Sequence, residues 1–241
     1  MLMRLRVSLP DRPGALGQVA RALGALGADI HQVTVLDREA GRAVDDFTVS
    51  WPGAPDQDEV RDRLSAVPGV HVEGAWHTRE VPGSAPDYDL LRHVAAEPVR
   101  AFTTLVDALP DLVGADWALT VPAADVAPGA RPAVVHRSWR APEVLELREP
   151  LSPRAAALRD GDVRLMSVPL ADTGLWLFVG RAEGVGLAFH RAELDRVVRL
   201  TEIITMLART GRAAAVAAAG VGAEVEMAMT GKEEPAAEGT V

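Results

Sequence analysis

The feature that most constrains this chain is a glycine turn between a predicted strand and a predicted helix, within the stretch LPDRPGALGQVARALGALGADIHQVTV. Residues Met3–Leu9 alternate between apolar and polar side chains, which is the period-two pattern of a half-buried strand. Leu16, Val19, Leu23 and Leu26 then recur at helical spacing on one face. Gly27 stands where a helix needs a left-handed closing residue. The stretch therefore predicts a strand, a turn and a helix that lead into a second strand.

The turn itself has the sequence DRPG. Asp11 is placed to cap the helix, and Pro13 fixes φ near the helix start. Gly14 keeps side-chain bulk away from the turn. Free backbone N–H groups around Ala15 and Leu16 would then face an open site that favours a carboxylate.

The pattern D-x-P-G-x-L, followed by G-A-D-I and a valine-rich strand, closely resembles the ACT domain over about residues 1–80. ACT domains are small regulatory modules that typically bind amino acids. The resemblance implies a homodimer that holds ligand between the glycine turn of one chain and the second strand of the other. The candidate ligand-binding residues are Asp11, Arg12, Gly14, Ala15, Leu16, Asp29 and Ile30.

Asp29 departs from the family pattern, because that position is usually asparagine and contacts ligand across the dimer interface. The aspartate places a negative charge there, which would pair with the ammonium of an amino acid and disfavour acidic ligands. The alternative for Asp29 is a solvated residue in the turn from helix to strand. For Asp11 and Gly14 the alternative is a turn that serves folding alone.

The rest of the N-terminal part completes a βαββαβ order. Ile30 breaks the parity of Val33 and Val35, so a bulge is predicted where the second strand begins. A hairpin at residues 38–42 leads to a third strand, followed by a helix at 56–66 and a fourth strand to Trp76. This order predicts a ferredoxin-like fold.

A segment rich in Pro, Gly and Ser separates this part from the rest, so we predict domains at 1–80 and 88–210 with a linker at 81–87. The second part predicts a helix interrupted at Pro98, strands at 117–121, 133–139, 163–170 and 175–179, and a closing helix at 190–209. Its end, residues 163–209, resembles the closing half of a GAF domain. His190 replaces the serine or threonine cap common in that family, which predicts a weaker cap.

The predicted fold class is therefore α+β, with a ferredoxin-like ACT domain followed by a GAF-like domain around an antiparallel central sheet. Residues 211–241 are rich in Ala, Gly and Glu, which predicts a disordered tail, with the alternative that the run RAAAVAAA extends the preceding helix by a turn or two.

Charge and composition argue against several classes of function and binding partner. The net charge is -9 with no basic face, which argues against nucleic acid as a partner. There are no cysteines, which excludes disulfides, zinc thiolate sites and a cysteine nucleophile and fits a cytoplasmic protein. No apolar run approaches the roughly 18 residues that a membrane helix needs, so no membrane contact is predicted.

No motif indicates catalysis, because neither G-x-S-x-G nor a Walker loop is present. No cofactor or metal is predicted either, since His71 and His77, on the same face of one predicted strand, would lie some 20 Å apart. We therefore predict a non-catalytic regulatory protein that binds an amino acid at an ACT dimer interface and relays it through the GAF-like domain. Two alternatives are a dimeric interaction module without a small ligand and a regulatory subunit of a metabolic enzyme.

Overall fold

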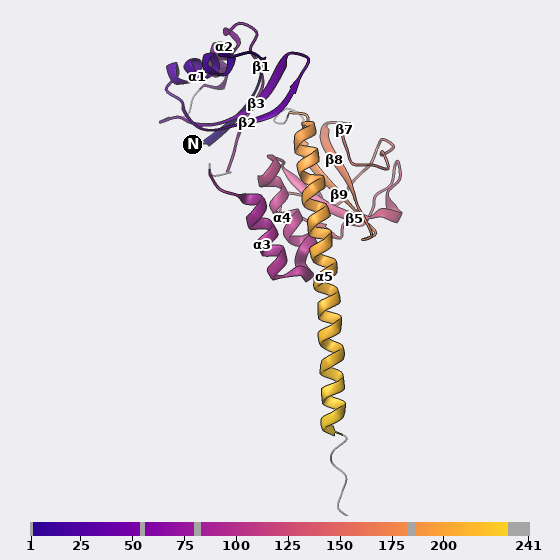
Figure 1. The fold of residues 1–241 in the computed structure, drawn as a ribbon. Helices are drawn as coiled ribbons and strands as arrows, with labels where there is room; N and C mark the ends of the chain where they lie inside the picture. Colours follow the sequence, from indigo (N-terminus) through magenta and orange to yellow (C-terminus); the bar gives the residue numbers. More distant parts are fainter. Residues whose placement is uncertain (1, 54–55, 80–82, 183–186, 231–241) are drawn as a thin grey trace, which may run out of the picture.

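The computed structural model describes residues 2–53, 56–79, 83–182 and 187–230. It contains a four-stranded sheet in the N-terminal part and a five-stranded sheet in the remainder, both antiparallel (Figure 1). Each sheet has its own apolar core, formed by residues between 3 and 72 in the first and between 90 and 208 in the second. The predicted α+β class is confirmed.

The N-terminal domain consists of β1 (Leu2–Pro10), α1 (Ala15–Ala25), β2 (Asp29–Glu39), β3 (Arg42–Ser50), α2 (Gln57–Ser65) and β4 (His71–His77). Its strand order β2-β3-β1-β4 is the predicted ferredoxin-like arrangement. The core face of the sheet carries alternate residues of β1, such as Leu5 and Val7, which pack with Val19 and Leu23 of α1. Strands β2 and β4 are the two edges.

Turns and bulges in this domain follow from local sequence. Gly27 ends α1 in the left-handed region at φ 75°, as predicted. The predicted bulge at the start of β2 is confirmed by a register shift between Ile30 and Gln32. A second bulge, in the pairing of β1 with β4, sets His71 opposite Ser8 but His77 opposite Met3. The two histidines therefore lie on opposite faces, and the sequence prediction of one shared face is wrong, because the extra residue reverses the alternation.

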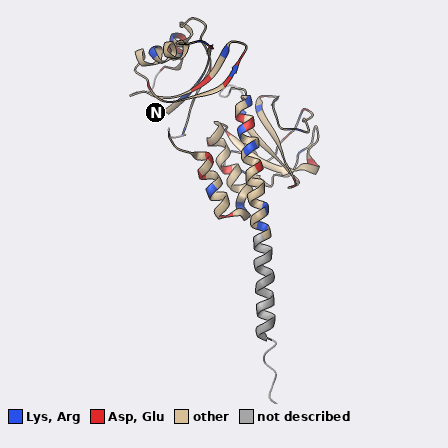
Figure 2. Cartoon of the chain, in the orientation of Figure 1, with Lys and Arg blue, Asp and Glu red and all other residues tan. Residues whose placement is uncertain are grey.

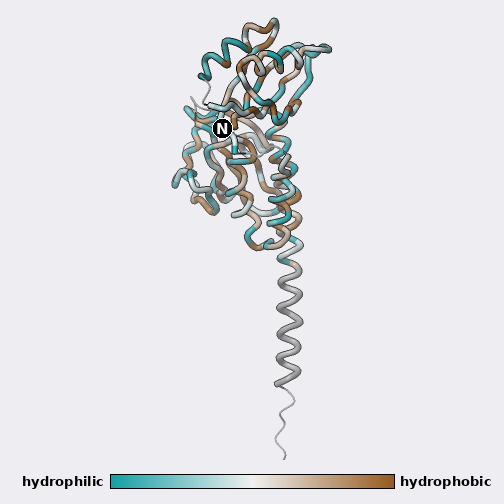
Figure 3. The backbone as a smooth tube through the Cα atoms, turned by 90° about the vertical axis from the view of Figure 1, so that its left-hand side faces the viewer, coloured by the Kyte–Doolittle hydropathy of each residue, from teal (hydrophilic) through white to brown (hydrophobic). Residues whose placement is uncertain are grey.

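The second domain consists of α3 (Pro86–Ala96), η1 (Pro98–Arg100), α4 (Ala101–Val113), β5 (Trp117–Pro122), η2 (Ala123–Asp125), β6 (His136–Arg137), β7 (Ala156–Asp160), β8 (Val163–Leu170), β9 (Leu175–Ala182) and α5 (Arg191–Thr230). The strand order is β6-β5-β9-β8-β7. Helices α3, α4 and α5 pack together over one face. On the other face Leu145 and Leu147 join Phe178 in a smaller apolar cluster. Figure 3 shows apolar stretches in brown in both domains.

Three segments differ from the sequence predictions. The strand expected at 133–139 is reduced to β6, and β7 was not predicted. Helix α3 begins at Pro86, inside the predicted linker, because proline suits the first position of a helix. Helix α5 continues to Thr230, where composition predicted a disordered tail from residue 211. Alanine has the highest helix propensity, and extending an existing helix avoids the cost of nucleation. Residues 231–241 lie outside the described residues.

Candidate functional site

Helix α1 begins at the glycine turn without a side-chain cap. Gly14 is the N-cap residue, with φ 86° in the left-handed region. A Cβ added at Gly14 would meet nothing within 4 Å, so the space outside the turn is open. Asp11 does not cap the helix, and that prediction is wrong. The N-cap is Gly14, three residues further on. The backbone N–H of Asp11 instead donates to the carbonyl oxygen of Gly41, and its carboxylate lies 3.8 Å from Nε of Arg38.

The open N–H groups of this helix belong to Leu16 and Gly17. Ala15 N–H donates to the carbonyl oxygen of Arg12 at 3.2 Å, so it is not free as predicted. Among the described residues, the N–H groups of Leu16 and Gly17 donate to no backbone carbonyl, and no side chain caps the helix. The Leu16 side chain is 42% exposed, so its predicted place on the core face is wrong. Two unpaired N–H groups at the positive end of a helix favour an anion.

A buried carboxylate lies near the middle of β3, on the face of the sheet that packs against α1. Asp45 on β3 is 3% exposed and pairs with Val7 and Val35 on the neighbouring strands. Its Oδ1 atom has no hydrogen-bond partner among the described residues. Burial raises the pKa of Asp45, Arg38 lowers it, and the charges of Asp11 and Asp46 raise it further.

The sequence contained a signal for this residue that our prediction missed. Asp45 and Asp46 interrupt a strand that otherwise reads as alternating apolar and polar residues. Aspartate is depleted in strands, so two in succession indicate a specific role.

Asp29 and Ile30 lie at the opposite end of the sheet from the turn. Asp29 pairs with Ser50 at the end of β3, whereas Pro10, next to the turn, pairs with Arg42 at its start. The Asp29 side chain is 80% exposed, and Ile30 packs against the core. A single chain therefore brings Asp11, Arg12, Gly14, Ala15 and Leu16 together but leaves Asp29 and Ile30 apart from them.

The sheet face away from α1 and α2 carries a charged contact with the second domain. Arg6 on β1 is 1% exposed. Its Nε and Nη2 atoms donate to the two carboxylate oxygens of Asp46 at 2.8 and 2.9 Å. Its Nη1 atom donates to Oε2 of Glu193 in α5 at 3.1 Å. The guanidinium also lies 5.3 Å from the ring centroid of Trp76. The alternation of β1 suggested a solvated polar face, and the second domain covers it instead.

Glu193 is the centre of this contact and also organises the start of α5. Its Oε1 accepts from Arg181 of β9 at 2.7 Å, and its Oε2 accepts from the backbone N–H of His190 at 2.7 Å. The ring Nδ1 of His190 accepts in turn from the N–H of Ala192 at 3.1 Å. Histidine thus supplies the cap that serine or threonine would give, within a reciprocal capping box.

Opposite charges in this network stabilise Arg6 and Glu193, whereas the pKa of Arg181 is lowered by burial and by the like charge of Arg6, despite Glu193. Burial opposes the charged form of Glu193, but Arg181 and Arg6 outweigh it, and the pKa of Glu193 is lowered. Burial also opposes the charge of Arg6, yet its bonds to Asp46 and Glu193 raise the Arg6 pKa. Figure 2 shows acidic and basic residues on the first turns of α5, at the end that meets the N-terminal domain.

A cleft of about 950 Å³ runs between the domains beside this network. One wall is the free edge of β4 with Trp76, and the other includes Gly114 and the pair Trp139 and Arg140. Trp139 is 97% exposed. The walls carry both acidic and basic side chains.

Across the described residues, no group of three or more His, Cys, Asp or Glu side chains is placed to hold a metal ion. Within the same residues, no helix combines the length and the apolar character needed to span a bilayer.

The βαββαβ order and the strand order β2-β3-β1-β4 define the N-terminal part as a small ferredoxin-like α+β domain with an open helix start at a glycine turn. Residues 3–69 match the family model of the ACT domain, and this part of the chain is an ACT domain. No curated protein matches the chain.

Three solved structures share local similarity with the chain. The GAF domain from an Acinetobacter phosphoenolpyruvate-protein phosphotransferase is 15% identical, over 54% of this chain and 96% of that one, with a TM-score of 0.38. A formyltetrahydrofolate deformylase from Pseudomonas putida is 17% identical over 40% of this chain, which spans only 38% of that protein, with a TM-score of 0.28. An unknown protein from Galdieria sulphuraria is 14% identical, over 84% of this chain and 90% of that one, with a TM-score of 0.29. Similarities at these TM-scores carry no argument about activity.

Proposed function

We propose that this chain is a non-catalytic, cytoplasmic regulatory protein whose ACT domain binds a free amino acid. The observation that carries the proposal is a pair of unsatisfied groups of opposite character, one at the start of α1 and one on the face of the sheet that α1 covers. Within the described part of the chain, the N–H groups of Leu16 and Gly17 lack an acceptor, and Oδ1 of the buried Asp45 lacks a donor. An amino acid carries a carboxylate for the first and an ammonium for the second.

The edge strand β2 supports a dimer as the binding form. Its side chains Val33 and Val35 are 37% and 46% exposed, although they lie in the middle of a strand. An apolar free edge is a template for pairing with another chain. A second copy paired there would bring its own Asp29 and Ile30 towards a ligand, and the second domain, which we predict to be GAF-like, would relay the occupied state.

The same exposed edge favours a second candidate function, a dimeric interaction module without a small ligand. Both candidates predict a dimer, but only the first requires Asp45 to remain charged.

Calorimetric titration with each of the twenty amino acids tests the proposal. We expect at least one to bind the parent protein, and Asp45→Asn to weaken that binding by at least tenfold because the ammonium loses its counter-charge. Asp62→Asn, which neutralises an exposed aspartate on α2, serves as the matched control and should bind like the parent.

Gly14→Val tests the other half of the site. A branched Cβ would enter the open space outside the turn, and φ 86° is unfavourable for valine, so binding should be lost while the dimer persists. If no amino acid binds the parent protein, or if both Asp45→Asn and Gly14→Val bind as the parent does, the amino-acid proposal is wrong.

A further inference from the structure

We propose that the Arg6–Glu193 bridge couples the ligand site of the ACT domain to helix α5. The ligand part of this inference rests on the proposed function, whereas the bridge itself is defined by the geometry. Arg6 lies in β1 and Glu193 lies 187 positions later, yet their side chains meet at 3.1 Å in a buried contact.

On the ACT side, the bridge and the ligand site share one strand. Asp45 and Asp46 are neighbours in β3, and successive residues of a strand point to opposite faces. Asp45 therefore points to the face that packs against α1, where we place the ligand site, while Asp46 on the other face holds the guanidinium of Arg6 through two hydrogen bonds. A change in the twist or position of β3 when ligand pairs with Asp45 would move Asp46, and Arg6 with it.

On the other side, the bridge acts on the start of a long helix. Glu193 accepts hydrogen bonds from Arg6, Arg181 and the backbone of His190, so it ties the first turn of α5 to both domains. Helix α5 then runs past the second domain to Thr230 (Figure 1). Because α5 is one continuous helix, its first turn is where a change in the ACT domain would reach it.

The distribution of charge allows the bridge to open. Arg6 with Asp46 forms a neutral pair within the ACT domain, and Arg181 with Glu193 forms a neutral pair within the second domain. Breaking only the Arg6–Glu193 bond leaves each buried charge with a partner, which avoids the large penalty of an isolated buried ion. This arrangement suits a reversible contact between domains.

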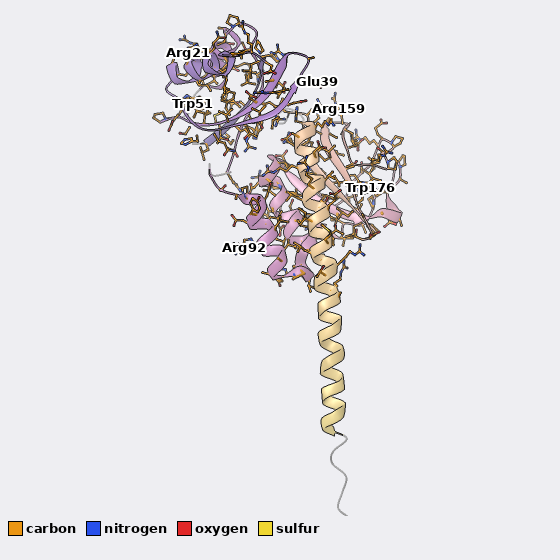
Figure 4. All side chains as sticks on the ribbon, in the orientation of Figure 1. Arg21, Glu39, Trp51, Arg92, Arg159 and Trp176 are labelled. Carbon is orange, nitrogen blue, oxygen red and sulfur yellow. The ribbon has the colours of Figure 1, made fainter. Side chains whose placement is uncertain are left out.

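Two measurements on Arg6→Met and a control test the coupling. The chain has no cysteine, so one cysteine introduced at Arg21 and one at Arg92, both exposed, can carry a pair of spin labels in different domains (Figure 4). Arg196→Met is the matched control, because Arg196 on α5 binds Asp87 through the same type of double contact but within the second domain.

Without ligand, Arg6→Met should broaden the distance distribution between the labels, and Arg196→Met should not. In titrations, Arg6→Met should change the dissociation constant of the best amino acid by a factor in the range of roughly 5 to 150 that is typical of coupled sites. If circular dichroism shows Arg6→Met to be unfolded, Glu193→Gln replaces it. This substitution keeps the shape of the Glu193 side chain and one oxygen that can accept from the N–H of His190.

An unchanged distance distribution in Arg6→Met overturns the bridge as the element that holds the domains. A broadened distribution with a dissociation constant within twofold of the parent value overturns the coupling. If no amino acid binds the parent, the proposed function and the ligand coupling both fail, while the ligand-free distances still decide the bridge.

Discussion

Asp45→Asn should make the ligand-free protein more stable at neutral pH, although it removes a group that we assign to ligand binding. The parent protein buries a carboxylate whose Oδ1 lacks a partner among the described residues. An unsatisfied buried polar group costs about 1–3 kcal/mol, and more when it is charged. Asparagine keeps the shape and one polar oxygen, so we expect it to recover about 1 kcal/mol of that cost. For a domain of this size, that corresponds to a rise of about 4–8 °C in Tm.

The pH dependence of this gain has a defined sign. Burial raises the pKa of Asp45, so the folded state binds more protons than the unfolded state at pH values between the two pKa values. The contribution of Asp45 to stability is therefore lost as pH rises from the usual aspartate pKa through the raised value. The free energies of unfolding of parent and Asp45→Asn should converge below that window and separate above it.

Urea denaturation from pH 4 to pH 8, followed by tryptophan fluorescence, measures both effects through the midpoint and slope. Asp62→Asn should follow the parent curve at every pH. A variant that is less stable than the parent at pH 7, or a difference that does not change with pH, would refute the assignment of Asp45 as a buried carboxylate with an unsatisfied oxygen among the described residues.

Three further predictions follow from the fold. Leu105→Ala and Ile204→Ala each truncate a side chain that is 0% exposed, so each should destabilise the second domain by about 2–5 kcal/mol. Hydrogen exchange should show the ACT domain still folded, and simultaneous loss of protection in the two domains would contradict their independence. Light scattering should show a dimer at micromolar concentration, and Val33→Lys on the β2 edge should make it a monomer; a monomeric parent would rule this out. Asp29→Asn should keep or improve binding of neutral amino acids and alter the preference among charged ones, and calorimetry that finds no change would exclude Asp29 from the site.

Local chemistry determined the elements of the ACT domain. The alternation of β1 and the hairpin between β2 and β3 depend on residues within a few positions of one another. Local sequence also sets the left-handed conformation of Gly27 and Gly41. The N-cap Asp56, which accepts from the N–H of Asp58, likewise depends on residues close in sequence. The same holds for the break at Pro98, which separates α3 from α4. Such signals are contained in short windows, and sequence periodicity reads them directly.

Some predictions from local sequence were wrong because the same residues fit two different local structures. Asp11 is a good cap by residue type, but Gly14 adopts the left-handed conformation and becomes the N-cap itself. The segment after residue 210 has the composition of a disordered tail and also the alanine content of a helix. The helix prevails up to Thr230 because α5 is already nucleated by its packed first half.

The charged contact between the domains could only be known from the tertiary structure. Arg6 occupies a position that alternation assigns to solvent, and Glu193 is an ordinary acidic residue in the first turn of a helix. Whether either is buried depends on a partner far away in sequence, and no periodicity encodes that partner. The sequence alone therefore determines where the ACT strands, turns and helices form. The packing of the two domains decides which charges are buried, because burial and pairing depend on the surroundings that distant segments supply.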